Sequence, residues 1–333
     1  MPRLDVLLPF RNAARTLDDA LASVLGEPWD GVLLAVDDGS TDGSDVVVAR
    51  WARLDARVVP LTSVGRGIVA ALETGLRVSK AEIVARMDAD DVSAPGRLAR
   101  TAEALAGDAS LGAVACQVRA VPEGAVGEGL RRYVAWQNAL LTADDHARAV
   151  FVESPLCHPA TALRRAALDD VGGFRDVPWA EDWDLWLRMT AAGHGLAKVA
   201  EVLFDWRHLP GRLTFTDPRY APARMVEARA HYLADAVRGR PLVVWGAGQT
   251  GRRLARALEG NGMHIHAFID IDPQKIGRRA RGAPILSCDD ALAARPRDSA
   301  VVAAVGARGA RELVRAELLA RGLVELEDFF CAA

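Results

Sequence analysis

The sequence predicts an α/β protein in two parts, each built on a mostly parallel sheet flanked by helices. Short apolar runs alternate with helical stretches from residue 6 to residue 105, a rhythm typical of parallel strands joined by helices. Gly239-Arg240-Pro241 breaks a helical stretch, and the rhythm restarts directly after it. The 333 residues also exceed the roughly 100–200 that one hydrophobic core commonly serves. We therefore predict a first domain over residues 1–238 and a second over residues 239–333.

The first domain begins with a regular succession of strands and helices. Leu17, Leu21 and Val24 fall on one stripe of a helix that opens at Thr16, and Pro95 suits the first turn of a later helix. Strands are predicted at 6–8, 32–36, 58–61 and 83–87, and helices from 16, over 68–78 and from 95. This order predicts a parallel sheet whose strands end at one common edge.

Between residues 112 and 207 the pattern is less regular, and we interpret this region as the part that binds a substrate. It contains a predicted strand at 113–118, a helix around 131–141 and a Trp-rich helix over 181–192, and the helical stretch 219–238 follows. The second domain then has predicted strands at 242–245, 265–269 and 300–305, with a helix that ends at 259.

Composition excludes several classes of partner and site. The net charge is −3, so the chain lacks the overall basic field that gathers nucleic acid. The four cysteines are far apart and form no CxxC pair, which argues against a zinc site and a disulfide framework and favours the reducing cytoplasm. Asp5 and Pro9 interrupt what would be the apolar part of a signal peptide, and no apolar run reaches the roughly 18–20 residues of a membrane span. We expect at most peripheral association with a membrane.

Two acidic turns each follow a predicted strand. Asp37 and Asp38 come directly after the strand at 32–36, at the end where open α/β sheets bind ligands. Asp88 and Asp90 follow the strand at 83–87, and in an extended segment two residues apart their carboxylates point the same way. Such a pair suits Mn²⁺ or Mg²⁺ that shares its remaining positions with phosphate oxygens. The alternative for both segments is a solvated polar turn without further function.

Three segments together resemble the N-terminal signatures of family 2 glycosyltransferases. They are Leu-Leu-Pro-Phe-Arg-Asn-Ala at 7–13, Val-Asp-Asp-Gly-Ser-Thr-Asp-Gly-Ser at 36–44 and Ala-Arg-Met-Asp-Ala-Asp-Asp at 85–91. The resemblance covers roughly residues 4–215 and implies the GT-A fold, a mixed, mostly parallel sheet flanked by helices. It further implies a donor site and a metal site. The donor-site residues are Pro9, Arg11, Asp37, Asp38 and Asp88, and the metal ligands are Asp88 and Asp90.

Arg66 is a further candidate for the donor site. In Gly65-Arg66-Gly67 it precedes a predicted helix, where backbone N–H groups and a guanidinium meet negative charge. A helix-start turn with a solvated arginine is the alternative. The sequence departs from the family just afterwards, with Glu73 where the family often has Asn and Ala81 where it often has Gly.

The resemblance also assigns roles to acids and a histidine further along the chain. Glu181 and Asp182 open the Trp-rich helix, where acids stabilise the helix dipole without any further role. The family carries a Glu-Asp pair in this context, which implies Asp182 as the general base that an inverting transfer needs, with Glu181 as the second candidate. Arg207-His208 resembles the loop that closes over the donor, which makes His208 a candidate metal ligand or phosphate contact. His158, in Cys157-His158-Pro159-Ala160, resembles the family's acceptor-side strand, although a lone histidine is more often structural.

The second domain carries a glycine fingerprint. Gly246, Gly248 and Gly251 form GxGxxG directly after a predicted strand, and Asp270 ends the following strand, near the spacing of a ribose-binding acid. The region resembles Rossmann-like domains that handle nucleotides or sugar nucleotides, and it implies a bound nucleotide or dinucleotide. A docking or vestigial role is the alternative, because so short a domain leaves little room for a second half.

Taken together, the sequence predicts a cytoplasmic inverting glycosyltransferase. It would move a sugar from a nucleotide-diphosphate sugar, with a UDP-sugar preferred, to a hydroxyl of a saccharide or lipid-linked acceptor in cell-surface polysaccharide or glycoconjugate synthesis. A homo-oligomer is compatible with the sequence. Two alternatives remain open: a non-catalytic nucleotide-sugar binding or scaffold protein, and an NAD-dependent sugar-nucleotide oxidoreductase that works through the second domain.

Overall fold

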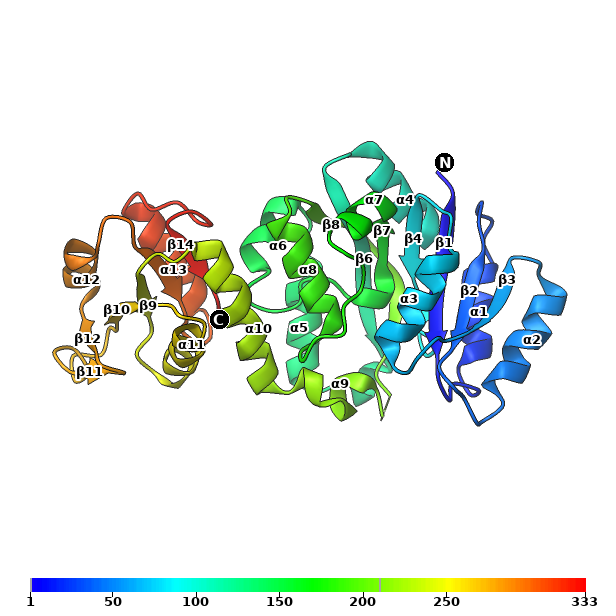
Figure 1. Cartoon of the computed structure of the whole chain (residues 1–333), viewed down its shortest axis with the longest axis horizontal. Helices are drawn as coiled ribbons and strands as arrows, with labels where there is room; N and C mark the ends of the chain where they lie inside the picture. Colours follow the sequence, from blue (N-terminus) through cyan, green and yellow to red (C-terminus); the bar gives the residue numbers. More distant parts are fainter. Residues whose placement is uncertain (1, 210) are drawn as a thin grey trace. The chain divides into compact units, whose positions relative to one another are not determined.

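The computed structural model describes residues 2–209 and 211–333, which divide into two compact units (Figure 1). The first unit comprises the chain up to His146 together with Pro155–Val177 and Glu181–Thr216. The second comprises Ala147–Ser154, Pro178–Ala180 and Asp217–Ala333. Residues 217–238 therefore pack with the second unit, so the compact units do not coincide with the predicted boundary between residues 238 and 239. That boundary remains a prediction about domain organisation.

The first unit is built on a mixed sheet that in the described residues has the strand order β3-β2-β1-β4-β7-β6-β8-β5. Strands β3, β2, β1 and β4 run parallel, β7 is antiparallel to both β4 and β6, β8 is parallel to β6, and β5 is antiparallel to β8. The strands are β1 (Leu4–Phe10), β2 (Leu33–Asp37), β3 (Val58–Thr62), β4 (Ile83–Arg86), β5 (Val92–Ser93), β6 (Leu111–Val121), β7 (Thr161–Arg164) and β8 (Gly195–Arg207).

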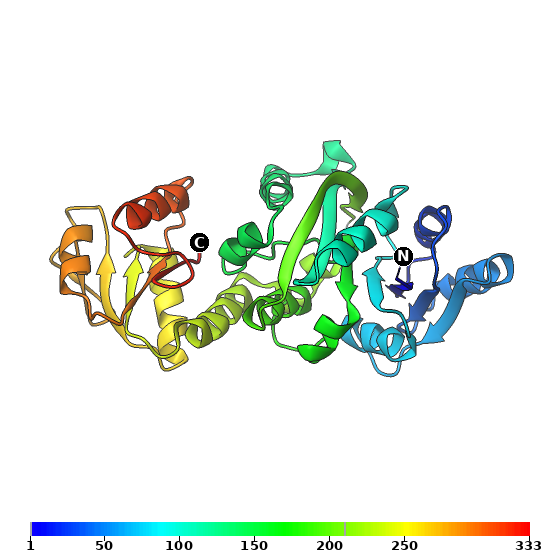
Figure 2. The same cartoon turned by 90° about the horizontal axis from the view of Figure 1, so that it is seen from above.

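Helices cover both faces of this sheet, with α1 and α4 on one face and α3 on the other (Figure 2). The helices up to residue 216 are α1 (Leu17–Leu25), α2 (Ser44–Leu54), α3 (Ile68–Val78), α4 (Arg97–Gly107), α5 (Glu128–Ala139), α6 (Ala143–Ala149), α7 (Arg165–Asp170), α8 (Glu181–Ala191) and α9 (Leu213–Thr216). Short 3-10 turns lie at η1 (Glu123–Ala125) and η2 (His158–Ala160). The prediction that Pro95 lies in the first turn of a helix is wrong, because Gly96 takes a positive φ of 87° and α4 begins at Arg97.

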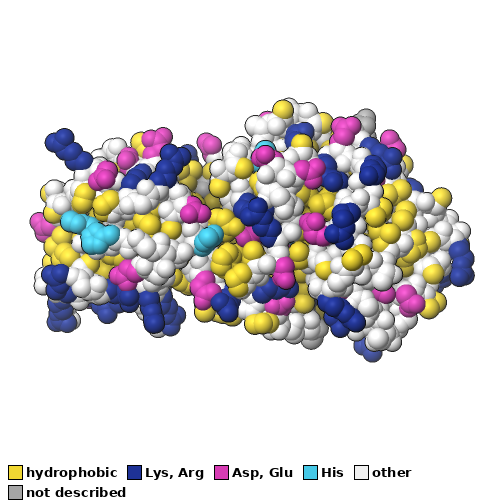
Figure 3. Space-filling view, viewed as in Figure 1, with side chains coloured by type: hydrophobic (Ala, Val, Ile, Leu, Met, Phe, Trp, Pro, Cys, Tyr) yellow, Lys and Arg dark blue, Asp and Glu magenta, His cyan; other side chains and the backbone are white. Residues whose placement is uncertain are grey.

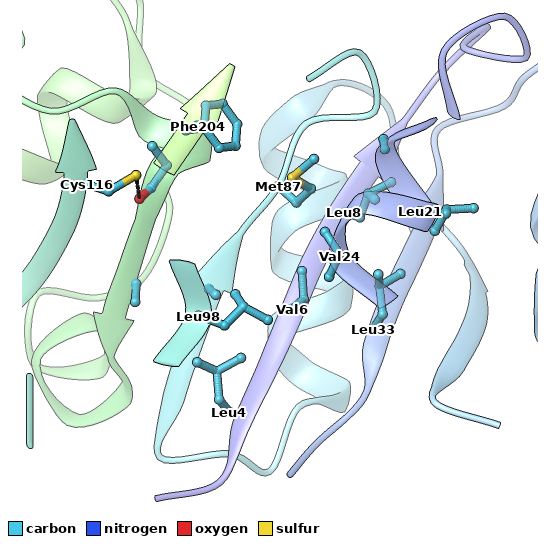
Figure 4. Packing of buried hydrophobic residues seen from close by; sticks show 14 of the residues in the cluster. Leu4, Val6, Leu8, Leu21, Val24, Leu33, Met87, Leu98, Cys116 and Phe204 are labelled. Atoms are coloured by element: carbon cyan, nitrogen blue, oxygen red, sulfur yellow. Dashed lines mark hydrogen bonds between the residues drawn. The ribbon is translucent and has the colours of Figure 1, made fainter. Parts of the chain in front are cut away.

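The core explains why the N-terminal strands read as apolar runs. Alternate residues of β1, Leu4, Val6 and Leu8, point to one face and pack against Leu21 and Val24 of α1 (Figure 4). Every residue of β1 is buried, as expected for a central parallel strand covered on both faces. A strand with one solvent-exposed face alternates apolar and polar residues, whereas a strand buried on both faces is mostly apolar. The central position of β1 in the sheet therefore explains why most of its sequence is a continuous apolar run.

The second unit contains a sheet of order β11-β12-β10-β9-β13-β14 in the described residues, parallel except for β11. Its strands are β9 (Leu242–Trp245), β10 (Ile265–Ile269), β11 (Arg279–Ala280), β12 (Ala283–Leu286), β13 (Ala300–Ala303) and β14 (Phe329–Cys331). Around them are η3 (Pro218–Tyr220), α10 (Pro222–Val237), α11 (Gln249–Gly260), α12 (Cys288–Ala294) and α13 (Ala310–Ala320). The predicted Rossmann-like arrangement of this part is confirmed.

Two surface properties bear on possible partners. On the face of the first unit drawn in Figure 3, basic and acidic side chains are interspersed, so this face carries no field of one sign. Over residues 2–209 and 211–333, none of the helices combines the length and the apolar character that a membrane crossing requires.

Candidate active site

Three aspartates converge directly after β4, at the carboxyl end of the parallel strands. One carboxylate oxygen from each of Asp88, Asp90 and Asp91 lies within 4.8 Å of the other two. The segment is a turn at Ala89-Asp90, closed by the Asp91 N–H donating to the carbonyl of Asp88 at 3.4 Å. The segment is thus a turn and not extended as predicted, and the turn adds Asp91 to the predicted pair Asp88 and Asp90.

The surroundings of Asp90 and Asp91 make their negative charge costly unless a proton or a cation offsets it. Burial raises the pKa of Asp90 above its ordinary value, with Arg212 opposing the shift and Asp88 adding to it. Burial also raises the pKa of Asp91 well above its ordinary value, again against the effect of Arg212. Hard carboxylate oxygens converging in this way are the ligands that Mg²⁺ and Mn²⁺ prefer. The three acids therefore fit a divalent ion.

Arg212 is the cation that lies among these acids. Its guanidinium is 3.3 Å from Asp91 Oδ1, 3.8 Å from Asp90 Oδ2 and 3.6 Å from Asp88 Oδ2. It also stacks over the Trp206 ring, 5.2 Å from the centroid. Arg212 lies 121 residues from Asp91 in the chain, so no local motif connects the two.

The predicted donor-side residues gather at the ends of β1 and β2. Asp38 accepts two hydrogen bonds from the N–H of Gly67, both at 3.0 Å, and lies 3.8 Å from the Arg11 guanidinium. A Cβ added to Gly39 would meet Arg66 Nη1 at 2.7 Å, so the Arg66 side chain crosses this turn. The structure thus brings Arg11, Asp38 and Arg66 together.

Pro9 and Asp37 support this end of the sheet. Pro9 is buried in β1 and pairs in register with Val36. Asp37 Oδ1 accepts from the N–H of Ser40 at 2.8 Å and from its hydroxyl at 2.6 Å. These bonds close the acidic turn that follows β2.

The acids of α8 stand on a firmly anchored helix. Trp183 and Trp186 are fully buried, and most other residues of this helix are buried as well. Glu181 is buried in the first turn, and Asp182 Oδ1 accepts from the N–H of Trp183 at 2.8 Å. The role of Asp182 as general base stays a prediction.

His208 has surroundings of a different kind. Its backbone N–H donates to the carbonyl of Val121 at 2.7 Å, and its ring meets Phe215 edge-on with centroids 5.1 Å apart. The acid cluster found among the described residues does not include it. Its role as a metal ligand or phosphate contact stays a prediction.

Glu73, which stands where the family often has Asn, has a structural contact of its own. Its Oε1 accepts from the N–H of Phe174 at 2.8 Å and so ties α3 to the loop that leads toward α8. Ala81, the other departure from the family pattern, is buried. Neither substitution touches the acid cluster.

The glycine loop of the second unit combines two tight glycines with an open one. A Cβ on Gly251 would lie 1.8 Å from the carbonyl oxygen of Gly246, and one on Gly246 would lie 2.7 Å from that of Ala304. A Cβ on Gly248 would meet nothing within 4 Å. Packing thus requires the first and third glycines, whereas the middle one faces open space, as expected where a ligand approaches the backbone.

Asp270 is engaged with the protein itself. Its Oδ2 accepts from the N–H of Ala247 and from Lys275 Nζ, both at 3.1 Å, and its Oδ1 accepts from the N–H of Asp272 at 3.0 Å. These bonds make Asp270 the support of the glycine loop. Ribose binding by Asp270 stays a prediction.

Each of the two parts of the chain matches a known protein family. Residues 5–172 match the sequence model of glycosyl transferase family 2, and residues 239–323 match that of the CoA binding domain. Two solved structures share the fold. One is the mannosyltransferase PcManGT from Pyrobaculum calidifontis in complex with GDP-Man and Mn²⁺, which is 22% identical with a TM-score of 0.53, over 78% of this chain and 75% of that one. The other is S. aureus TarS 1-349 in complex with UDP-GlcNAc, which is 16% identical with a TM-score of 0.55, over 77% of this chain and 71% of that one.

Curated relatives point to the same family. A 25% identical stretch covers 62% of this chain and 65% of an uncharacterized glycosyltransferase of Haemophilus influenzae, and a 26% identical stretch covers 54% of this chain and 64% of the amylovoran biosynthesis glycosyltransferase AmsE of Erwinia amylovora. The chain thus spans just under two thirds of the length of these two relatives. The UDP-Gal:alpha-D-GlcNAc-diphosphoundecaprenol beta-1,3-galactosyltransferase of Escherichia coli is 25% identical over 62% of this chain and 74% of its own. With half of its length matched by the family model and its first unit in the predicted GT-A fold, the chain belongs to glycosyl transferase family 2.

Proposed function

We propose that the chain is an inverting glycosyltransferase that uses a nucleotide-diphosphate sugar and a divalent ion. The observation that carries this proposal is the convergence of Asp88, Asp90 and Asp91 at the carboxyl end of β4. Asp38 and Arg11 stand at the ends of the neighbouring parallel strands β2 and β1, where open α/β sheets bind nucleotides. Nucleotide and diphosphate sites would therefore share one edge of the sheet.

In the proposed mechanism, each group acts at a defined point of a direct displacement. Asp182 accepts the proton of the acceptor hydroxyl, whose oxygen forms a bond to the anomeric carbon as the bond from that carbon to the diphosphate oxygen breaks. The carboxylates of Asp88, Asp90 and Asp91 would hold Mn²⁺ or Mg²⁺, and the ion would supply positive charge that offsets the charge of the departing diphosphate. Arg11 and Arg66 donate to nucleotide or phosphate oxygens, and positioning together with charge stabilisation supplies most of the rate.

The names of relatives guide the choice of substrates. The E. coli relative is named for a UDP-sugar donor and a diphosphoundecaprenol-linked acceptor, and one structural neighbour binds UDP-GlcNAc. We therefore propose a UDP-sugar as donor and a saccharide or lipid-linked hydroxyl as acceptor in surface polysaccharide synthesis. The Erwinia relative, named for amylovoran biosynthesis, supports this setting.

The decisive experiment measures donor-dependent transfer. The purified chain is incubated with a panel of UDP- and GDP-sugars, with and without Mn²⁺, and with pooled lipid-linked and free saccharide acceptors. We expect release of the nucleoside diphosphate that requires both metal and acceptor and that disappears in Asp90→Ala. Donor binding that is never followed by release would instead establish the non-catalytic nucleotide-sugar binding protein.

For the second unit we propose nucleotide binding at the glycine loop. The open position of Gly248 beside the start of α11 supports this, as does the match to the CoA binding domain. Thermal shift with NAD(H), coenzyme A and UDP-sugars tests it. An oxidoreductase would further require that a bound nicotinamide be reduced or oxidised by a sugar nucleotide, which absorbance at the NADH band detects.

A further inference from the structure

Arg86 is a buried arginine whose guanidinium connects the ends of two strands with two side chains of the site. It is the last residue of β4 and is 1% exposed. Its Nη1 donates to the carbonyls of Leu7 and Met87, each at 3.1 Å. Its Nη2 donates to Asp88 Oδ1 at 2.7 Å, and its Nε donates to His158 Nε2 at 3.3 Å. Because the guanidinium is planar and bonded on each nitrogen, it is fixed in one orientation.

The contact with Asp88 determines which carboxylate oxygen faces the acid cluster. Asp88 Oδ1 is taken by Arg86, and Asp88 Oδ2 is the oxygen that lies 3.6 Å from the Arg212 guanidinium in the cluster. Without Arg86 the Asp88 carboxylate would lose the 2.7 Å hydrogen bond that holds its Oδ1. Arg86 therefore presents Oδ2 to whichever cation the cluster holds.

His158 continues the connection toward α8. An Arg N–H only donates, so His158 Nε2 is the acceptor and the ring proton is on Nδ1. That Nδ1 lies 4.0 Å from Glu181 Oε1 in the first turn of α8. The ring is held between Phe174 and Trp186, with both centroid distances 5.7 Å. Both the orientation and the tautomer of the imidazole are thus fixed.

We propose that Arg86 and His158 are positioning residues, which orient Asp88 for the divalent ion and align the Glu181-Asp182 turn with it. This inference rests on the proposed function, because it assumes that Asp88 holds the ion. Arg86, His158 and Glu181 are buried, and they lead from the partly exposed Asp88 to the helix that carries the candidate base. Hydrogen bonds join Asp88 to Arg86 and Arg86 to His158, and a 4.0 Å approach of His158 Nδ1 to Glu181 Oε1 completes the path. Groups that orient a ligand in this way typically change metal affinity by about 10- to 100-fold when they are removed.

A pair of substitutions at His158 separates the two contacts of its ring. In His158→Gln, the side-chain oxygen reaches the place of Nε2 and keeps an acceptor for Arg86. In His158→Asn, the side-chain amide reaches the place of Nδ1 and keeps the donor toward Glu181, but Arg86 Nε loses its acceptor. We expect the Gln variant to keep the Kd for Mn²⁺ within about twofold and the Asn variant to raise it about tenfold. The Gln variant should lower kcat without changing the KM for the donor, because Glu181 in the α8 turn loses the nearby Nδ1 of His158.

Arg97 offers a matched control for Arg86. It is also fully buried at this end of the sheet and donates to the Arg86 carbonyl at 3.1 Å and the Pro159 carbonyl at 3.3 Å. We expect Arg86→Lys, which cannot reach Asp88 and His158 together, to raise the Kd for Mn²⁺ about tenfold or more. Arg97→Lys should lower the melting temperature and leave that Kd unchanged.

The experiment measures free Mn²⁺ by electron paramagnetic resonance during titration of each variant, after circular dichroism has shown that it is folded. Equal Mn²⁺ affinity in His158→Gln and His158→Asn, or wild-type affinity in folded Arg86→Lys, would overturn the positioning role. If Arg86→Lys does not fold, the His158 pair decides. Wild-type Mn²⁺ binding by Asp90→Ala would instead overturn the proposed function, so the two failures are distinguishable.

Discussion

The Arg212 guanidinium lies 3.3 Å from Asp91 Oδ1, inside the cluster of carboxylates that fits a divalent ion. The guanidinium offsets the repulsion among the three carboxylates, of which that of Asp91 is buried and those of Asp88 and Asp90 are partly exposed. We expect a divalent ion to take the place of the guanidinium among these carboxylates, an exchange of one cation for the other.

The first prediction concerns this exchange. Arg212→Gln should lower the metal-free melting temperature by roughly 5 °C, because the buried carboxylates lose their counter-charge. Mn²⁺ should then raise the melting temperature of the variant more than that of the wild type. Differential scanning fluorimetry with a Mn²⁺ titration measures both effects. As control, Arg224→Gln removes an exposed ion pair with Glu227 and should leave the melting temperature within about 1 °C. If Mn²⁺ raised the melting temperature of the wild type and of Arg212→Gln by the same amount, the exchange would be contradicted.

The second prediction concerns the general base. Asp182→Asn should lower kcat by about 100-fold or more while the KM for the donor stays within about threefold, because the amide cannot accept the acceptor proton. Steady-state transfer assays measure both constants. Glu181→Gln provides the comparison, and a larger loss of kcat in that variant than in Asp182→Asn would reverse the assignment.

The third prediction concerns acid stability. Burial lowers the pKa of His146 from 6.5 to about 4. Its Nδ1 bonds the Thr142 carbonyl at 2.9 Å, and its Nε2 has no partner in the described part of the chain. The unfolded chain binds the proton more readily than the folded protein does. The contribution of His146 to the free energy of unfolding is therefore complete above about pH 6.5 and is lost as the pH falls toward 4. The full loss is about 3 kcal/mol.

Urea unfolding between pH 7 and pH 4 tests this effect. His146→Leu cannot take up a proton, so the variant should lose less stability than the wild type over this range. The two proteins are compared by how steeply the free energy of unfolding falls with pH. The difference between the two slopes cancels the titration of the other groups. Parallel curves for the two proteins would show that His146 does not titrate in this way.

The fourth prediction separates packing from binding in the glycine loop. Gly251→Ala should destabilise the second unit by about 1–3 kcal/mol, because its Cβ would overlap the carbonyl oxygen of Gly246. Gly248→Ala should leave stability within about 0.5 kcal/mol, because the new methyl group meets nothing. If the loop binds a nucleotide, the Gly248 variant should nevertheless lose most of the thermal shift that the nucleotide produces. An unchanged nucleotide shift in folded Gly248→Ala would place the ligand elsewhere.

Elements that local pattern specifies were predictable. The strands β1, β2 and β4 were visible because central parallel strands are apolar on both faces. The edge strand β3 was visible as a short apolar run, and α8 was visible as a Trp-rich helical segment. The strand β8 was not predicted. Its exposure varies irregularly along the strand, and it includes charged residues such as the buried Lys198 and the partly exposed Asp205, which hides its regularity.

By itself, the sequence determined the two α/β parts, the family and most of the acids of the candidate site. The tertiary structure decided the rest: the turn that adds Asp91, the place of Arg212 among the carboxylates, and the link from Arg86 to His158. The physical reason is that periodicity and motif spacing report the surroundings of neighbouring residues in the chain. Contacts across 72 or 121 residues depend instead on how the sheet brings strand ends and loops together.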